Sequence, residues 1–176
     1  MNTFIALFRG INVGGRNILP MKELRTILET LGCENIKTYI QSGNVLFQTD
    51  KGRAEVANDM SQGIKKSHGF EPRVLILDKG EFNKAIENNP FSTEDGKILH
   101  FFFLEQKPVN PDLDSIHKLK TQSELYEIKD KVFYLYAPDG IGRSKLVANV
   151  EKKLGVAATA RNWNSVNKIN AMLDAG

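Results

Sequence analysis

Apolar residues recur along this chain at two alternating spacings, and the order of these spacings repeats in the second half. A period of two is typical of a strand, and a period of 3.6 is typical of a helix. The first half shows strand, helix, two strands, helix and strand, in residues 3–8, 20–31, 36–41, 45–49, 53–67 and 73–77. After a short helix at 81–87, the same order returns in residues 98–104, 110–119, 124–128, 132–136, 144–154 and 156–160.

This repeated order predicts an α+β protein made of two ferredoxin-like βαββαβ subdomains. Each is expected to be an antiparallel sheet with its helices packed on one face. We place the first subdomain in residues 1–78 and the second in residues 79–176, where a final helix capped by Asn164 or Ser165 ends the chain. A chain of 176 residues can bury a sufficient core without disulfides or metals.

Capping and turn residues support several of these boundaries. Pro20 and Pro111 each suit a first helical position, and Asn110 is a suitable cap before Pro111. Ser144 can cap the helix at 144–154. Gly43 suits a tight turn between the second and third strands, which should therefore form a hairpin.

The composition favours a cytoplasmic protein without a metal or cofactor. Cys33 is the only cysteine, so no disulfide can form within the chain, which fits a reducing compartment. No signal peptide and no apolar run long enough to cross a bilayer are present, so we expect no membrane partner. His68, His100 and His117 lie on different predicted elements without cysteine neighbours, and we expect no metal site. The net charge of +3 is mild, but both ends of the chain are locally cationic.

The first candidate site is a glycine-rich loop between the first strand and the first helix. Its glycines permit positive φ and close approach to a ligand, and its two guanidiniums can bind phosphate or carboxylate. A Walker A loop has Lys and Ser or Thr where this chain has Arg16 and Asn17, and the helix begins too late for a P-loop. An anion site and a purely structural connection both fit. The candidate ligand-binding residues are Arg9, Gly10, Asn12, Gly14, Gly15 and Arg16.

The second candidate site is the loop at residues 138–145, which ends at a helix N-terminus. The helix dipole points into this loop, so Arg143 and the amides near Ser144 are positioned to hold a phosphate. The alternative is that Ser144 only caps its own helix and that Asp139 and Gly140 form a turn.

The third candidate site is formed by Arg161, Asn162 and Trp163, directly before the last helix. Trp163 can stack on a base or sugar while Arg161 and Asn162 bind polar edges. The alternative is that Trp163 packs in the interior while Asn162 or Asn164 caps the helix.

Five motifs are specific in combination: residues 8–15 (FRGINVGG), 19–21 (LPM), 39–45 (YIQSGNV), 142–146 (GRSKL) and 159–164 (TARNWN). Together they resemble a widespread bacterial family catalogued only as a domain of unknown function, number sixteen ninety-seven in that series. The resemblance covers essentially the whole chain, and it implies a two-subdomain α+β fold without an assigned activity, substrate or catalytic residue.

The leading functional hypothesis is a binding module in which these arginine and glycine loops converge on an anionic ligand, either a nucleotide or a nucleic-acid phosphate. One alternative is an enzyme that acts on a phosphorylated or acidic small molecule, although the sequence identifies no general base for it. The other alternative is a protein-interaction scaffold that uses an exposed apolar patch.

Overall fold

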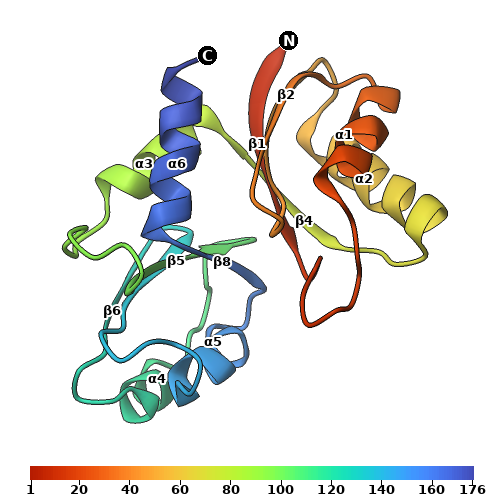
Figure 1. Cartoon of the computed structure of the whole chain (residues 1–176). Helices are drawn as coiled ribbons and strands as arrows, with labels where there is room; N and C mark the ends of the chain where they lie inside the picture. The colour runs from red at the N-terminus through yellow and green to blue at the C-terminus, as the bar shows by residue number, and fades with distance from the viewer. The chain divides into compact units, whose positions relative to one another are not determined.

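Residues 1–176 are all described by the structure, a computed structural model with eight strands and six helices (Figure 1). The first elements are β1 (Asn2–Arg9), α1 (Met21–Thr30), β2 (Glu34–Tyr39), β3 (Asn44–Thr49), α2 (Arg53–His68), β4 (Arg73–Asp78) and α3 (Lys79–Glu87). They are followed by β5 (Leu99–Leu104), α4 (Leu113–Leu119), β6 (Leu125–Lys129), β7 (Val132–Tyr136), α5 (Lys145–Leu154), β8 (Ala158–Asn162) and α6 (Trp163–Asp174). None of the helices combines the length and the apolar composition that a bilayer crossing requires.

The two sheets have the same topology. Their strand orders are β2-β3-β1-β4 and β6-β7-β5-β8, and every neighbouring pair is antiparallel. In each sheet the first and third strands in the sequence lie at the centre, which is the ferredoxin-like order. The predicted fold class is therefore confirmed.

The chain forms two compact units. The first contains Met1–Lys84 together with Lys168–Gly176, and the second contains Ala85–Asn167. The sequence-based division at residue 78 differs from this at two places, because the start of α3 and most of α6 belong to the first unit. The boundary between the units falls inside α6, between Asn167 and Lys168. The apolar pattern of α6 continues across this boundary, so the sequence does not reveal it.

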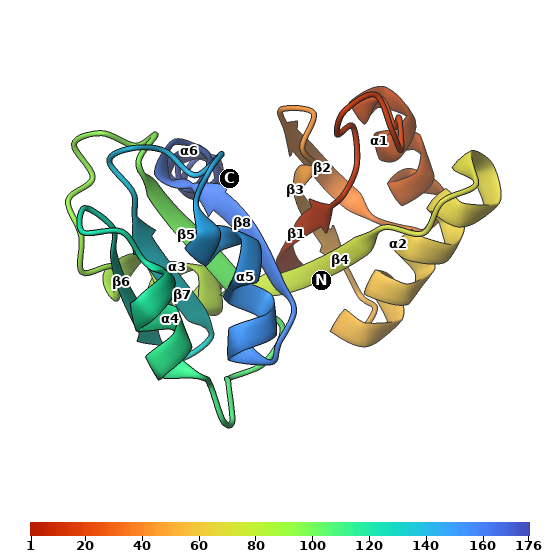
Figure 2. The same ribbon diagram turned by 90° about the horizontal axis from the view of Figure 1, so that it is seen from below.

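The first sheet carries α1 and α2 on one face (Figure 2). Phe4, Ala6 and Phe8 alternate along β1 into the core beneath these helices, as the period of a strand requires. Ile5 and Leu7, on the reverse face, are also fully buried. The apolar run on both faces of β1 thus belongs to a central strand, as the sequence predicts.

The second sheet carries α4 and α5 on one face, where Phe102, Phe133 and Leu135 pack against the helices (Figure 2). The reverse face is aromatic. The rings of Phe101 and Tyr134 meet edge to face with centroids 4.9 Å apart, and the Tyr134 hydroxyl donates to the backbone oxygen of Ala85 at 2.5 Å.

The cap of α4 differs from the predicted one, and the cap of α6 is one of the alternatives that the sequence allowed. The cap of α4 is Asp112, whose side chain accepts a hydrogen bond from the Ser115 amide, rather than Asn110, and α4 has only seven residues. The first turn of α6 is capped by Asn162, whose Oδ1 accepts from the Ser165 amide at 3.0 Å. In both segments several capping side chains stand close together, and only backbone geometry selects among them.

Candidate functional site

The glycine-rich loop after β1 folds into a small β-hairpin, residues 12–17, which we call the tip hairpin. The Asn12 amide donates to the Asn17 oxygen and the Arg16 amide to the Val13 oxygen, each at 2.9 Å. Gly14 and Gly15 have φ values of 58° and 73°, as the two central residues of a type I′ turn require. The turn therefore accounts for this glycine pair, and a phosphate-binding loop is not needed to explain it.

Two asparagine side chains fix the tip hairpin to its surroundings. Asn12 Nδ2 donates to the backbone oxygens of Leu19 and Gln41, and Asn17 Nδ2 donates to the Gly10 oxygen. Asn12 and Asn17 have φ values of 51° and 53°, in the left-handed region that asparagine tolerates better than most residues. One of these bonds joins residues 29 positions apart in the sequence, so the hairpin is fixed to the neighbouring β2–β3 turn as well as to its own ends.

The turn between β2 and β3 packs directly against the base of this loop. The Phe8 amide donates to the Gly43 oxygen at 2.9 Å. A Cβ atom at Gly43 would lie 2.7 Å from both Ile11 Cδ1 and Phe8 Cβ. Only glycine leaves room for this approach, so the two loops form one rigid unit at the end of β1.

The tip hairpin and the neighbouring turn expose apolar side chains beside a cation. The exposed fraction of the side chain is 63% for Val13, 57% for Ile18 and 48% for Ile40. Arg16, which lies between Val13 and Ile18 in the sequence, is also exposed. We define Val13, Arg16, Ile18 and Ile40 as the tip surface. Val13 and Arg16 face each other as the bridge pair of the tip hairpin, and exposed apolar side chains that form a contiguous patch mark an interaction surface.

A second cationic feature lies at the end of β1. Arg9 stands directly opposite Arg73 of β4 in the antiparallel register, and both residues are exposed. Side chains in this relation have Cβ atoms about 5 Å apart. The first 22 residues and residues 35–49 contain no Asp or Glu, but Arg9 and Arg73 both take part in interactions within the chain. Both residues are therefore engaged within the protein.

At the second predicted site, a protein carboxylate already occupies the helix N-terminus. Ser144 Oγ accepts from the Val147 amide at 3.2 Å and donates to Glu124 Oε2 at 2.6 Å. Glu124 is only 3% exposed, and its other oxygen accepts from the Thr121 amide. A bound phosphate would be repelled by Glu124, so Ser144 acts as the structural cap that the sequence also allowed.

The third predicted site is involved mainly in packing. Arg161 Nη1 donates to the backbone oxygen of Ala160, and burial lowers the pKa of the Arg161 guanidinium to about 10. The Trp163 ring lies against Phe101, with ring centroids 5.8 Å apart. Together with the Asn162 cap of α6, these contacts correspond to the interior alternative.

The second and third predicted loops lie on opposite faces of the second sheet. Ala160 packs on the face that α5 covers, so its neighbour Arg161 points to the reverse face, where Phe101 and Trp163 meet. Ser144 caps α5 on the first of these faces. These two loops therefore do not converge on one pocket, while Arg9 and Arg16 belong to the first unit.

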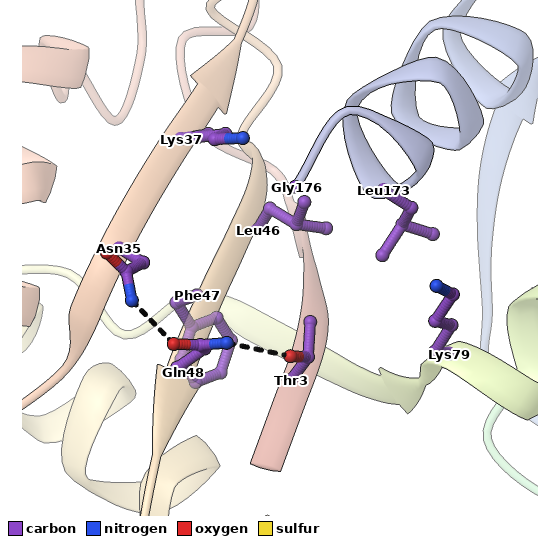
Figure 3. Close-up of a pocket in the computed structure, with 9 residues that line it drawn as sticks. All are labelled: Thr3, Asn35, Lys37, Leu46, Phe47, Gln48, Lys79, Leu173 and Gly176. Carbon is purple, nitrogen blue, oxygen red and sulfur yellow. Dashed lines mark hydrogen bonds between the residues drawn. The ribbon is translucent and has the colours of Figure 1, made fainter. Parts of the chain in front are cut away.

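A cavity of about 300 Å³ lies in the first unit, and no sequence pattern predicts it. It lies between β1, β2 and β3 on one side and Lys79, Leu173 and Gly176 on the other (Figure 3). It is lined by Thr3, Asn35, Lys37, Leu46, Phe47, Gln48, Lys79, Leu173 and Gly176. These residues come from β1, β2, β3, α3 and the end of the chain, so no local motif contains them.

The fold places this chain in the class of α+β proteins with two ferredoxin-like units in tandem. A rigid, exposed loop follows the first strand. The chain belongs to the family described as protein of unknown function (DUF1697), whose model matches residues 1–134. The resemblance inferred from the sequence motifs is thereby confirmed.

Among solved structures, the chain is similar to the conserved bacterial protein SP0830 from Streptococcus pneumoniae. The two share 26% sequence identity and superimpose with a TM-score of 0.71, over 98% of each chain. No curated protein matches the sequence.

Proposed function

We propose that this protein is a binding module that docks an acidic protein segment through the tip surface. The observation that carries the proposal is the combination of exposed aliphatic side chains and Arg16 on a hairpin locked by the Asn12 and Asn17 side chains. This retains the anionic partner expected from the sequence, but it replaces the three converging loops with one surface of the first unit.

Rigidity supports a binding role for the tip surface. A loop that is ordered before binding loses little conformational entropy when a partner arrives. The type I′ turn, the three hydrogen bonds of the Asn12 side chain and the contact at Gly43 all order this loop in the free protein.

The chemistry of the tip surface favours protein over nucleic acid. Surfaces that bind single-stranded nucleic acid combine cations with aromatic rings on which bases stack. Here the exposed side chains are Val13, Ile18 and Ile40, which cannot stack on bases. Aliphatic contacts flanked by arginine suit a protein segment that carries both apolar and acidic residues.

The proposal can be tested by photo-crosslinking in the native cell. A photoreactive amino acid replaces Val13, and the matched control replaces Val109, which is 91% exposed and lies in the second unit. We expect the Val13 probe to form an adduct with a protein whose crosslinked peptide is acidic. Arg16→Glu should reduce this adduct at least about tenfold, because it places like charges at the contact.

Three outcomes would contradict the proposal. These are equal adducts from the Val13 and Val109 positions, an adduct that nuclease removes but protease does not, and an adduct unaffected by Arg16→Glu. The nuclease-sensitive result would restore the nucleic-acid hypothesis.

A further inference from the structure

A β-bulge in β2 determines which side chains reach the cavity of the first unit. Glu34 pairs with Gln48 and Lys37 pairs with Leu46, so β2 has one residue more than β3 over this stretch. Without the extra residue, Ile36 would stand opposite Leu46 and Lys37 would point toward the helices. With the bulge, Ile36 is buried in the core and Lys37 lies at the cavity.

The bulge is maintained at a conformational cost. Asn35 has a φ of 51°, a left-handed conformation that residues other than glycine rarely adopt. Its side chain donates from Nδ2 to Gln48 Oε1 at 2.5 Å. Unfavourable backbone of this kind is concentrated at functional sites, where it aims side chains. The bulge thus points to a site rather than to an irregularity of the sheet.

Asn35, Gln48 and Thr3 form a row of hydrogen bonds along the cavity wall. Gln48 accepts from Asn35 and donates from Nε2 to Thr3 Oγ1 at 3.2 Å (Figure 3). The Thr3 hydroxyl oxygen accepts this bond, so the hydroxyl proton of Thr3 does not point at Gln48 and can be donated to a ligand. The second Nε2 proton of Gln48 is also available, so the wall offers donors to an anion.

Two ammonium groups complete the cavity. Lys37 and Lys79 lie on opposite sides of it, and no Asp or Glu side chain contributes to the lining (Figure 3). Lys37 Nζ lies beside Gly176, 3.0 Å from the position that a Cβ atom would take there. Leu46 and Leu173 supply an apolar surface between the polar groups. The volume of about 300 Å³ is at the lower end of the range for small-molecule sites.

We propose that this cavity binds a small aliphatic dicarboxylate. One carboxylate pairs with Lys37 and the other with Lys79, the Thr3 hydroxyl and the Gln48 amide donate to the nearer oxygens, and the methylene chain lies on Leu46 and Leu173. Lysine acts as a point charge and lacks the bidentate fork of arginine, so two separated lysines match a ligand with two separated charges. The site does not involve the tip surface.

Calorimetric titration of the full chain with succinate, glutarate and adipate tests this inference. We expect saturable binding of at least one of them with a dissociation constant below about 1 mM, and binding of butyrate at least about tenfold weaker. Lys37→Met and Lys79→Met should each weaken dicarboxylate binding about tenfold, whereas Lys152→Met on α5 should not change it. Gln48→Glu, which keeps the side-chain shape but adds a negative charge, should abolish binding.

Three results would contradict binding of a dicarboxylate in this cavity. Inorganic phosphate that binds more tightly than every dicarboxylate, no saturable binding, or binding unchanged by both lysine substitutions would overturn the inference. The photo-crosslink at Val13 should be unaffected by Gln48→Glu, so failure of the cavity proposal and failure of the docking proposal are distinguishable.

Discussion

Two hydrogen bonds join the side-chain amide of Asn12 to the backbone N–H and C=O of Leu19. This is the pair of bonds that a residue of a neighbouring β-strand would form. Nδ2 donates to the Leu19 oxygen at 2.8 Å, and Oδ1 accepts from the Leu19 amide at 2.7 Å. Nδ2 also donates to the Gln41 oxygen at 2.7 Å. One side chain thus connects the tip hairpin, the approach to α1 and the β2–β3 turn.

Removal of this amide should destabilise the first unit more than removal of the amide at Asn17. Asn12→Ala leaves a backbone donor and acceptor of Leu19 without partners and puts alanine at positive φ, so we expect a loss of about 2–3 kcal/mol in unfolding free energy. Asn17→Ala also places alanine at positive φ, but it removes only one exposed side-chain hydrogen bond, so it should cost about 1–2 kcal/mol. Urea unfolding measures both values, and hydrogen exchange at the Leu19 amide should accelerate only in Asn12→Ala. Equal losses would show that the Asn12 bonds are not coupled to the fold.

The contact at Gly43 can be separated from its backbone conformation. Gly43 and Gly69 have φ values of 83° and 78°, but only at Gly43 would a Cβ meet other atoms. Gly69→Ala should therefore cost about 1 kcal/mol, the usual penalty of positive φ. Gly43→Ala should cost about 3 kcal/mol, since the contacts with Phe8 and Ile11 add to that penalty. Chemical unfolding of the two variants under one condition gives the comparison, and similar losses would refute a close approach at Gly43.

The topology of both units could be predicted because it follows from local patterns. An apolar run on both faces predicts a central strand such as β1, and apolar stripes at helical spacing predict α1 and α5. These signals depend on residues within one element. The order of the elements then leaves few ways to form a sheet.

The candidate sites depend on contacts between distant residues, which a pattern does not contain. Gly14 and Gly15 fit an anion-binding loop and a type I′ turn equally well until the pairing of Asn12 with Asn17 is known. Glu124 occupies the N-terminus of α5 from 20 residues earlier in the sequence. The alternation of residues 36–41 predicts a strand there, but it does not reveal that β2 begins at Glu34 and contains a bulge.

Ser144 should be important for stability rather than for ligand binding. Ser144→Ala removes the cap of α5 and one donor to the buried Glu124 carboxylate, and we expect a loss of about 2–3 kcal/mol. Ser144→Thr keeps the hydroxyl and should lose less than about 1 kcal/mol. Adding Glu124→Gln to Ser144→Ala should recover part of the loss, because a buried amide needs less compensation than a buried carboxylate. Thermal or urea unfolding tests this order, and a fully additive double variant would contradict the proposed coupling.

His100 should make the protein less stable in mild acid. The ring is 6% exposed and its Nε2 has no hydrogen-bond partner. Burial lowers the pKa of His100, and a hydrogen bond to the Lys97 backbone only partly opposes this effect. Above the ordinary histidine pKa of about 6.5, the ring is neutral in both the folded and the unfolded chain and pH has no effect through it. Below about 6.5 the unfolded chain gains a proton that the folded chain does not, so stability falls as the pH falls, by at most about 1.4 kcal/mol per pH unit.

Comparison of the wild type with His100→Leu isolates this contribution, since every other titrating group is the same in both proteins. We expect the urea midpoint of the wild type to decrease more steeply than that of the variant between about pH 7 and about pH 5. At about pH 7.5 the variant should be at least as stable, because leucine removes a buried nitrogen without a partner. Direct NMR titration of the His100 ring in the folded wild type provides a second measurement that does not depend on the variant. A ring pKa at or above about 6.5, or parallel pH profiles for the two proteins, would show that the folded chain can accommodate the charged imidazolium at this position.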